Sequence, residues 1–272
     1  MIREESEKAT AGDKISAIFQ VRMGSTRLPG KVLIEIEGKP LLQHVVERVA
    51  RSKHIDEIIL ATTTGSKDIP ILEFARKQGL KCFAGSEEDV LDRFYKCAKT
   101  YSAQNIVRIT PDDPFKDPEV IDKGIEIYNE GKGTVDYVTN TLPPTYPIGL
   151  DIEVFSFSAL YKAWNEATKI SEREHVTPYI WNHPQLFNIK NFSYEKDISG
   201  NHWTLDTEKD LSFTREIYRR LYPVKQEFLM VDILELLFRE PKLSEINFGA
   251  DRFDGYKKSL EKDKIMRGTN DG

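Results

Sequence analysis

The sequence predicts an α/β fold in which helices flank a mostly parallel β-sheet. Three observations support this prediction: short apolar strands alternate with helical patterns through residues 15–129, a glycine- and cation-rich turn follows the first strand, and acidic residues follow two later strands. Strands and helices in this rhythm form βαβ units. The rhythm changes after residue 134, which predicts an α+β insertion over about residues 140–200.

Local signals define the elements in chain order. Apolar residues recur at three- and four-residue intervals across residues 40–52, which is the period of a helix that buries one face. Gly79 ends the next helical pattern, and Asp117 with Pro118 begins another as N-cap and first-turn proline. The predicted strands cover residues 15–19, 57–61, 80–83, 105–110, 135–138, 150–155, 187–194 and 201–205. The predicted helices cover residues 40–52, 69–78, 90–101, 118–129, 157–167, 172–181, 207–222 and 231–239.

These elements predict a single domain over residues 14–250. The segments outside it, 1–13 and 254–272, are rich in charge and poor in apolar side chains. Such a composition buries too little apolar surface to offset the entropy of ordering the chain. We therefore expect two flexible tails.

The composition excludes several classes of protein. The 272 residues include 39% hydrophobic side chains, enough for a real core, and carry a net charge of −5. An acidic balance argues against a general nucleic-acid or anionic-membrane binder. Residues 1–13 lack the apolar segment of a signal peptide, and no apolar run reaches the length of a membrane span. We expect a cytoplasmic protein without nucleic-acid or membrane partners.

The strongest chemical signal lies in residues 19–31. Arg22, Arg27 and Lys31 follow the first predicted strand, together with two glycines. Glycines let a backbone bend around a ligand and present its N–H groups, and cations on such a turn form a cradle for an anion. The spacing is neither a Walker A loop nor a dinucleotide fingerprint. We interpret the stretch as a polyphosphate cradle with Lys31 on a surface loop, and a basic surface turn is the alternative.

Two carboxylates follow predicted strands, which places them at the same sheet edge as the cradle. Asp112 follows the strand at residues 105–110, and Asp206 follows the strand at 201–205. Ligands of open α/β sheets bind at the carboxyl ends of strands, and Mg²⁺ prefers carboxylates together with phosphate oxygens. The pair therefore predicts one magnesium site, with Asp113 as a third candidate ligand. The alternatives are a turn residue beside proline for Asp112 and a helix-capping neighbour for Asp206.

The chain also resembles a known family. Residues 19–31 are similar to the signature loop of the sugar-acid cytidylyltransferases, with Val21 where that loop has alanine. The nearest branch contains the spore-coat polysaccharide cytidylyltransferase-like proteins, and CMP-KDO synthetase is more distantly similar. The resemblance extends in order over about residues 15–215, through the segments at 61–64, 85–93, 108–118, 149–155, 172–179 and 203–211.

The resemblance implies a Rossmann-like nucleotidyltransferase fold and a role for each matching residue. The implied catalytic residues are Arg22, Lys31, Asp112 and Asp206, of which the two aspartates hold the metal. The implied nucleotide-binding residues are Val21, Arg22, Met23, Gly24, Ser25, Arg27, Lys31, Thr62 and Thr110. The implied acceptor-binding residues are Asp151, Glu153, Arg173, Glu174 and His175. The chain departs from the family at Pro111, where glycine is usual.

The activity that the resemblance implies is a magnesium-dependent transfer of CMP from CTP to an acidic sugar or phosphonate-like acceptor. Pyrophosphate is released, and the product serves surface polysaccharide or glycoconjugate biosynthesis. Arg173 is a candidate clamp for the acid group, and residues 135–138 and the insertion are candidates for homodimer contacts. The alternatives are a glycosyltransferase, a guanylyltransferase and a non-catalytic nucleotide-binding homologue. The lack of a D-x-D motif argues against the glycosyltransferase.

Overall fold

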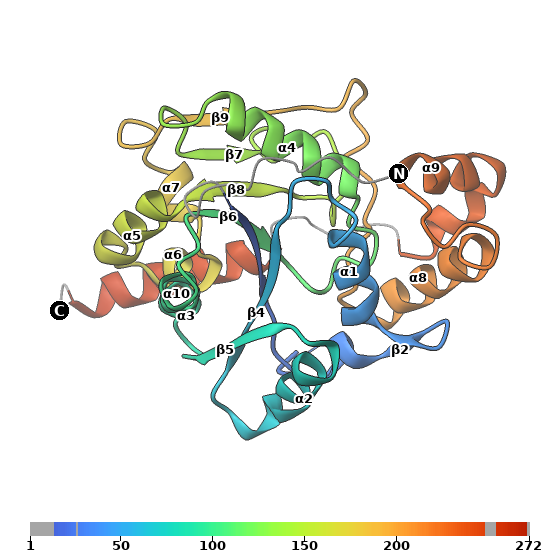
Figure 1. Ribbon diagram of the computed structural model, residues 1–272, viewed down its shortest axis with the longest axis horizontal. Helices are drawn as coiled ribbons and strands as arrows, with labels where there is room; N and C mark the ends of the chain where they lie inside the picture. Colours follow the sequence, from blue (N-terminus) through green and yellow to red (C-terminus); the bar gives the residue numbers. More distant parts are fainter. Residues whose placement is uncertain (1–13, 26, 248–253, 271–272) are drawn as a thin grey trace, which may run out of the picture.

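A seven-stranded β-sheet with helices on both faces forms the centre of the protein (Figure 1). The computed structural model describes residues 14–25, 27–247 and 254–270. The strand order is β5-β4-β1-β6-β8-β7-β9, and β2 and β3 form a separate two-stranded ribbon. The predicted α/β class is confirmed.

The elements have the following bounds. The strands are β1 Ile15–Gln20, β2 Glu35–Ile36, β3 Lys39–Pro40, β4 Glu57–Thr63, β5 Lys81–Gly85, β6 Asn105–Ile109, β7 Tyr137–Thr139, β8 Glu153–Ser156 and β9 Ile189–Asn191. The α-helices are α1 Leu41–Val49, α2 Ile69–Gln78, α3 Val90–Thr100, α4 Pro118–Glu130, α5 Phe157–Glu166, α6 Ile170–His175, α7 Pro178–Trp181, α8 Glu208–Leu221, α9 Met230–Arg239 and α10 Asp254–Asn270. Short 3₁₀ helices cover η1 Lys31–Leu33, η2 Ser66–Asp68 and η3 Pro241–Glu245. Within the described ranges, no helix combines the length and the apolar composition needed to cross a membrane.

The parallel half of the sheet is built around β1. This strand pairs in parallel with β4 on one side and with β6 on the other, and β4 pairs in parallel with β5. The carboxyl ends of these strands therefore lie along one edge of the sheet, where α/β proteins bind their ligands. The cradle loop after β1 and the acidic turn after β6 both start at this edge.

The segment after residue 134 extends the same sheet. β8 lies antiparallel between β6 and β7, and β9 pairs in parallel with the other edge of β7. Both edges of β7 are therefore occupied, and all three of its residues are buried. The suggestion that residues 135–138 make homodimer contacts is wrong for this strand, because its backbone is already paired on both sides.

The strands predicted over residues 150–155 and 187–194 are shorter in the structure, as β8 and β9, and two other predicted elements differ in kind. The helix predicted over residues 172–181 is divided into α6 and α7, because Pro178 has no N–H and starts a new helix. The strand predicted over residues 201–205 forms only one bridge, between Ile148 and His202. Its backbone instead crosses the strand ends, where the Leu205 N–H donates to the Asp112 carbonyl at 2.8 Å.

Successive strand residues contribute to two different cores. Phe19 and Val107 belong to a core that includes residues of α1, α4, α8 and α9, whereas Ile18 and Ile106 belong to a core that includes residues of α3, α5 and α7. The alternation follows from the two-residue period of a strand. Because both faces of β1 and β6 are buried, these strands are rigid, and they fix the positions at which the loops after their carboxyl ends begin.

Residues 254–270 form helix α10, which corrects the prediction of a flexible tail for these residues, whereas residues 271 and 272 lie outside the described ranges. Helix α10 packs against α6: Asp263 Oδ1 accepts from the Ser171 N–H at 3.2 Å, and Ser259 Oγ lies 3.0 Å from His175 Nε2. Tyr256 also packs edge-on against His175 and Trp181. The contacts are mostly polar, so a search for an apolar stripe misses them. The predicted tail at residues 1–13 lies outside the described residues.

We expect Gly149→Ala to destabilise the fold by about 1–3 kcal/mol. Gly149 has φ +101°, and a Cβ there would lie 2.9 Å from the carbonyl carbon of Trp203. Gly200→Ala is the matched control, because a Cβ at Gly200 would meet nothing within 4 Å. Urea unfolding of both variants measures the difference, and equal stabilities would contradict the close approach of residues 149 and 203.

Candidate active site

A polar site at the carboxyl edge of the sheet is centred on Lys31. Its Nζ donates to Asp112 Oδ2 at 2.5 Å, to Asp206 Oδ1 at 2.8 Å and to the Leu205 carbonyl at 3.0 Å. Lys31 is only 9% exposed, so its expected place on a surface loop is wrong. The two carboxylates and the carbonyl come from segments far away in the sequence and close over the ammonium.

Backbone bonds and one carboxylate hold the cradle loop in place. The Met23 N–H donates to Asp68 Oδ1 at 2.7 Å, and the Gly30 N–H donates to the Met23 carbonyl at 3.2 Å. Ser25 Oγ accepts from the Leu28 N–H at 3.2 Å. Sequence reasoning missed Asp68, which is buried. Its signal is its position soon after β4, since that strand ends at the same edge.

Two further cations of the loop can be reached from solvent. Arg27 Nη2 lies 3.0 Å from Asp206 Oδ1, and its side chain is 48% exposed. Arg22 is also exposed to solvent. An anion arriving at this edge therefore meets Arg22 and Arg27 before it meets Lys31.

Charge and burial oppose each other in the centre of the site. Burial lowers the pKa of Lys31, but Asp112 and Asp206 outweigh it and hold the pKa above its ordinary 10.5. Burial likewise raises the pKa of Asp112, but Lys31 outweighs it and holds the pKa below 3.8. The stabilisation from Asp112 is thus present above its ordinary pKa and is lost as the pH falls through the lowered value. Both groups are charged at neutral pH.

The two carboxylates suit a magnesium ion that also binds phosphate. Asp112 and Asp206 already share one cation, the Lys31 ammonium, so their oxygens converge on a common position. Mg²⁺ takes one or two carboxylates and completes its shell with phosphates and water. Across the described ranges, no group of three or more His, Cys, Asp or Glu side chains is placed to hold a metal. The donor set therefore fits an ion that arrives with a polyphosphate.

The third candidate ligand is committed elsewhere. Asp113 is 5% exposed, accepts a hydrogen bond from the Thr110 hydroxyl, and lies 2.9 Å from Lys116 Nζ. Burial raises the pKa of Asp113, and the charge of Asp112 raises it further. Together they outweigh Lys116, which lowers the pKa. Asp112 is the residue of this turn that faces Lys31.

Two of the predicted nucleotide-binding residues lie inside the protein. Val21 and Thr62 have no exposed surface, and the Val21 N–H donates to the Ala61 carbonyl at 3.1 Å. The Val21 side chain belongs to the apolar core, and the Thr110 hydroxyl donates to Asp113. Of the residues predicted to bind the nucleotide, the cradle segment from Arg22 to Lys31 is the part that borders the site.

The predicted acceptor-binding residues do not form one group. Arg173 Nε donates to Asp89 Oδ2 at 2.7 Å, and its Nη1 donates to the carbonyls of Trp164 and Ala167, both at 3.0 Å. These bonds tie α6 to the start of α3 and to the end of α5. In this arrangement Arg173 is held by Asp89 and two backbone carbonyls, so its role as a clamp for the acceptor stays a prediction.

The remaining predicted acceptor residues make their contacts in three different places. Glu174 Oε2 accepts from Ser259 Oγ at 2.8 Å, so Glu174 and His175 both contact α10. The Asp151 carbonyl accepts from Lys116 Nζ at 2.6 Å. Glu153 belongs to a buried cluster with Arg108. Of this set, Glu153 is the residue that lies on a strand next to the parallel half of the sheet.

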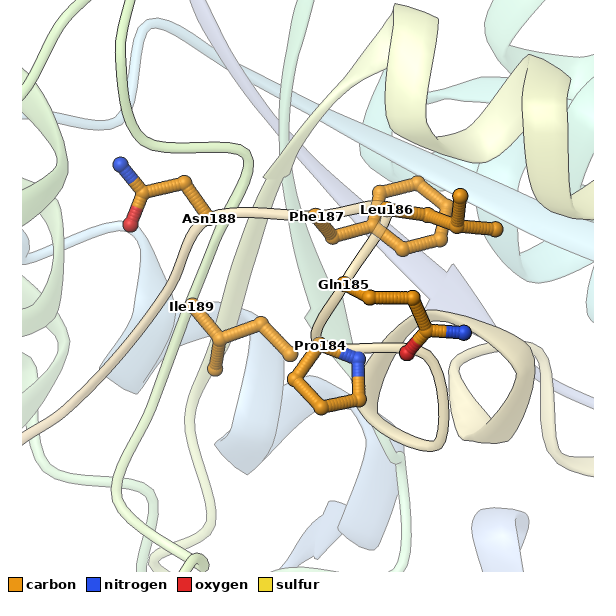
Figure 2. Close-up of a pocket in the computed structure, with 6 residues that line it drawn as sticks. All are labelled: Pro184, Gln185, Leu186, Phe187, Asn188 and Ile189. Atoms are coloured by element: carbon orange, nitrogen blue, oxygen red, sulfur yellow. The ribbon is translucent and has the colours of Figure 1, made fainter.

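A surface hollow elsewhere does not fit a polyphosphate. Figure 2 shows six residues that line it, from the loop before β9 and the first residue of that strand: Pro184, Gln185, Leu186, Phe187, Asn188 and Ile189. None of these side chains carries a charge. The hollow therefore offers no cation to a phosphate group.

The site lies within a region that matches a known family. Residues 16–232 match the family model described as cytidylyltransferase, and this span contains Lys31, Asp112 and Asp206. The chain belongs to the cytidylyltransferase family. It is a nucleotidyltransferase, and the predicted resemblance is confirmed. Helix α10 lies beyond the matched residues of this cytidylyltransferase.

Individual relatives agree with the family. The chain is 33% identical over 231 residues to the spore coat polysaccharide biosynthesis protein SpsF of Bacillus subtilis, covering 82% of this chain and 94% of that protein. It is 39% identical over 114 residues to a 3-deoxy-manno-octulosonate cytidylyltransferase of Geobacter metallireducens, covering 41% and 43%. A solved cytidylyltransferase from Leptospira borgpetersenii is 31% identical with a TM-score of 0.82, covering 88% of this chain and 99% of that one. The predicted Rossmann-like nucleotidyltransferase fold is confirmed.

We expect Lys31→Met to destabilise the cytidylyltransferase and to make its stability depend on magnesium. Removing one partner of a buried ion pair costs about 3–5 kcal/mol, and the cost is smaller here because the Asp112 and Asp206 side chains are 25% and 21% exposed. Thermal unfolding with and without MgCl₂ measures the effect. Mg²⁺ should raise the Tm of the variant more than that of the wild type, because the ion replaces the lost ammonium.

Lys39→Met is the control for this comparison. Lys39 pairs with Glu47 at 2.8 Å on the surface, where both side chains are at least one-third exposed, and such a pair contributes about 0–1 kcal/mol. An equal Mg²⁺ effect on the Tm of Lys31→Met and wild type would contradict the shared cation position.

Proposed function

We propose that this cytidylyltransferase transfers CMP from CTP to an acidic sugar or a related acid, with Mg²⁺ as cofactor and pyrophosphate as second product. The observation that carries the proposal is the Lys31 ammonium between Asp112 and Asp206, at the strand ends and inside the family region. Two relatives support the acceptor class, since one is a spore coat polysaccharide biosynthesis protein and the other is a 3-deoxy-manno-octulosonate cytidylyltransferase.

The chain's own residues bind and position the reactants. Arg22 and Arg27 meet the β- and γ-phosphates from the solvent side. Most of the described N–H groups of the loop are already bound within it or to Asp68, so the two arginines supply most of its donors. Asp112 and Asp206 would hold the magnesium ion, which neutralises phosphate charge and polarises the α-phosphate. An oxygen of the acceptor forms a bond to the α-phosphorus, and the bond to the pyrophosphate oxygen breaks.

Rate enhancement then comes from positioning and electrostatics. Phosphoryl-type transfers need little covalent chemistry from the protein. Lys31 supplies a fixed positive charge in a site where little water competes with it. We further propose that the protein works in the cytoplasm as a homodimer, with CTP and an acidic acceptor as its ligands and without nucleic acid.

A pyrophosphate assay tests the reaction. We expect the protein to release pyrophosphate from CTP in preference to ATP, GTP and UTP when Mg²⁺ and a suitable member of a panel of sugar acids and phosphonates are present. Reactions without acceptor are the control. A preference for GTP would replace CTP in the proposal, and absence of pyrophosphate with every nucleotide would contradict it.

We expect Asp112→Asn and Asp206→Asn each to lower turnover on the order of 100-fold or more. The double variant should be little worse, because residues that act as a unit are not additive. Turnover is measured against Mg²⁺ concentration, and circular dichroism checks the fold. Asp232→Asn is the control, since Asp232 pairs with Lys225 on the surface of α9 at 2.8 Å. Near-normal activity of Asp206→Asn at limiting Mg²⁺ would contradict its role as a metal ligand, and Asp206 would then be only a residue that precedes α8.

A further inference from the structure

A second cluster of charged side chains lies at the same edge of the sheet as the Lys31 site. Arg108 is near the end of β6, the strand that leads to Asp112. Its Nε donates to the side-chain oxygen of Gln20 at 2.9 Å, and Gln20 is the last residue of β1, directly before the cradle. Figure 1 shows β6 between β1 and β8. Arg108 therefore stands between the nucleotide cradle and the strands that follow residue 134.

Two of the three nitrogens of the Arg108 guanidinium are fixed. Nε is bound to Gln20, and Nη1 pairs with Glu153 on β8. Within the described ranges, no hydrogen-bond partner meets Nη2, and the side chain remains 13% exposed. An arginine carries five N–H donors in one plane. Gln20 and Glu153 therefore fix the orientation of the Arg108 guanidinium, and the N–H donors of Nη2 remain available for a ligand.

Glu153 is held as firmly as the arginine. Its carboxylate accepts from the Tyr137 hydroxyl at 2.6 Å and from the Thr177 hydroxyl, in addition to Arg108. Its side chain is 12% exposed. Burial raises the pKa of Glu153, but Arg108 and the two hydroxyls outweigh it and keep the pKa below its ordinary value. The carboxylate therefore stays ionised and keeps its partner in place.

Backbone strain supports this cluster. Val176 has φ 72° and ψ −56°, and the Thr177 N–H donates to the His175 carbonyl at 2.9 Å, which together make a γ-turn. This turn is rare, and a fully buried β-branched residue in it costs about 1–3 kcal/mol. Hydrogen bonds hold both residues that flank Val176. The His175 ring is bonded to the Ser259 hydroxyl, and the Thr177 hydroxyl donates to the Glu153 carboxylate. Such strain persists where the surrounding structure over-determines it, and that is most common at ligand sites.

The chemistry of the cluster fits the anionic group of an acceptor. Arg27 pairs with Asp206 at the Lys31 site, and Arg173 is engaged by Asp89. Among the described residues, Arg108 is the arginine on β6, between the cradle and β8, and a guanidinium binds a carboxylate or phosphonate through two parallel N–H bonds. We propose that Arg108 binds the acid group of the acceptor and so determines acceptor specificity, with Gln20 and Glu153 as positioning residues. This inference rests on the proposed function.

A double variant tests the assignment without leaving a buried charge unpaired. Arg108→Met alone would strand the Glu153 carboxylate, so the test uses Arg108→Met with Glu153→Gln. The probe is the acid from the panel that gives the greatest turnover, compared with its neutral amide. We expect the KM of the acid to rise at least 10-fold while the KM of CTP is unchanged, and the preference for the acid over the amide to fall by a similar factor. Arg220→Met with Glu216→Gln removes a surface ion pair from α8 and is the control.

The outcomes are distinct. A purely structural role would lower the Tm and change both KM values together, leaving the ratio of acid to amide untouched, and this would overturn the assignment. An unchanged KM for the acid in a folded double variant would also overturn it. If the wild type releases no pyrophosphate with any acid, the proposed function fails and the assignment fails with it. If the wild type releases pyrophosphate with an acid, and the Arg108→Met, Glu153→Gln variant shows the same KM for that acid, only the assignment of Arg108 fails and the proposed function stands.

Discussion

The site depends on one interaction, the hydrogen-bonded ammonium of Lys31 between two carboxylates. It joins the loop after β1, the turn after β6 and the extended segment before α8, which are distant in the sequence. Pairing of β1 with β6 places the first two of these side by side. The third is brought there by the close approach of Gly149 to Trp203, since any Cβ at residue 149 would push this segment away. The fold thus places three separate segments around one cation.

The sequence predicts the parts of this arrangement that follow from strand ends. Parallel strands share an edge, so a cation-rich loop after β1 and carboxylates after later strands had to be neighbours. The burial of Lys31 could not be predicted in the same way, because it depends on the Leu205 carbonyl and on Asp206, which arrive through tertiary contacts. Asp68 was missed for a related reason. A carboxylate after a strand looks like a turn or capping residue until the Met23 N–H is seen to donate to it.

The acceptor side was harder to predict, because its local patterns have more than one tertiary solution. Residues 172–175 have the composition of a charged helical turn, and only the packed structure shows that Arg173 turns to Asp89 while Glu174 turns to Ser259. The positive φ of Val176 has no signal in the sequence, since β-branched residues favour the opposite conformation. Helix α10 was likewise hidden, because it docks mainly through polar side chains and one tyrosine instead of an apolar stripe.

The balance of charge around Lys31 has a consequence for how ligands enter. Lys31 and Arg27 face Asp112 and Asp206, so the site presents no excess of negative charge although the whole chain carries −5. A polyphosphate that draws either cation toward itself leaves the two carboxylates facing each other with less compensation. In the proposed function, a divalent cation would relieve that repulsion and would make the edge more attractive to phosphate. Nucleotide and metal affinities would then be linked by one coupling free energy, which acts equally in both directions.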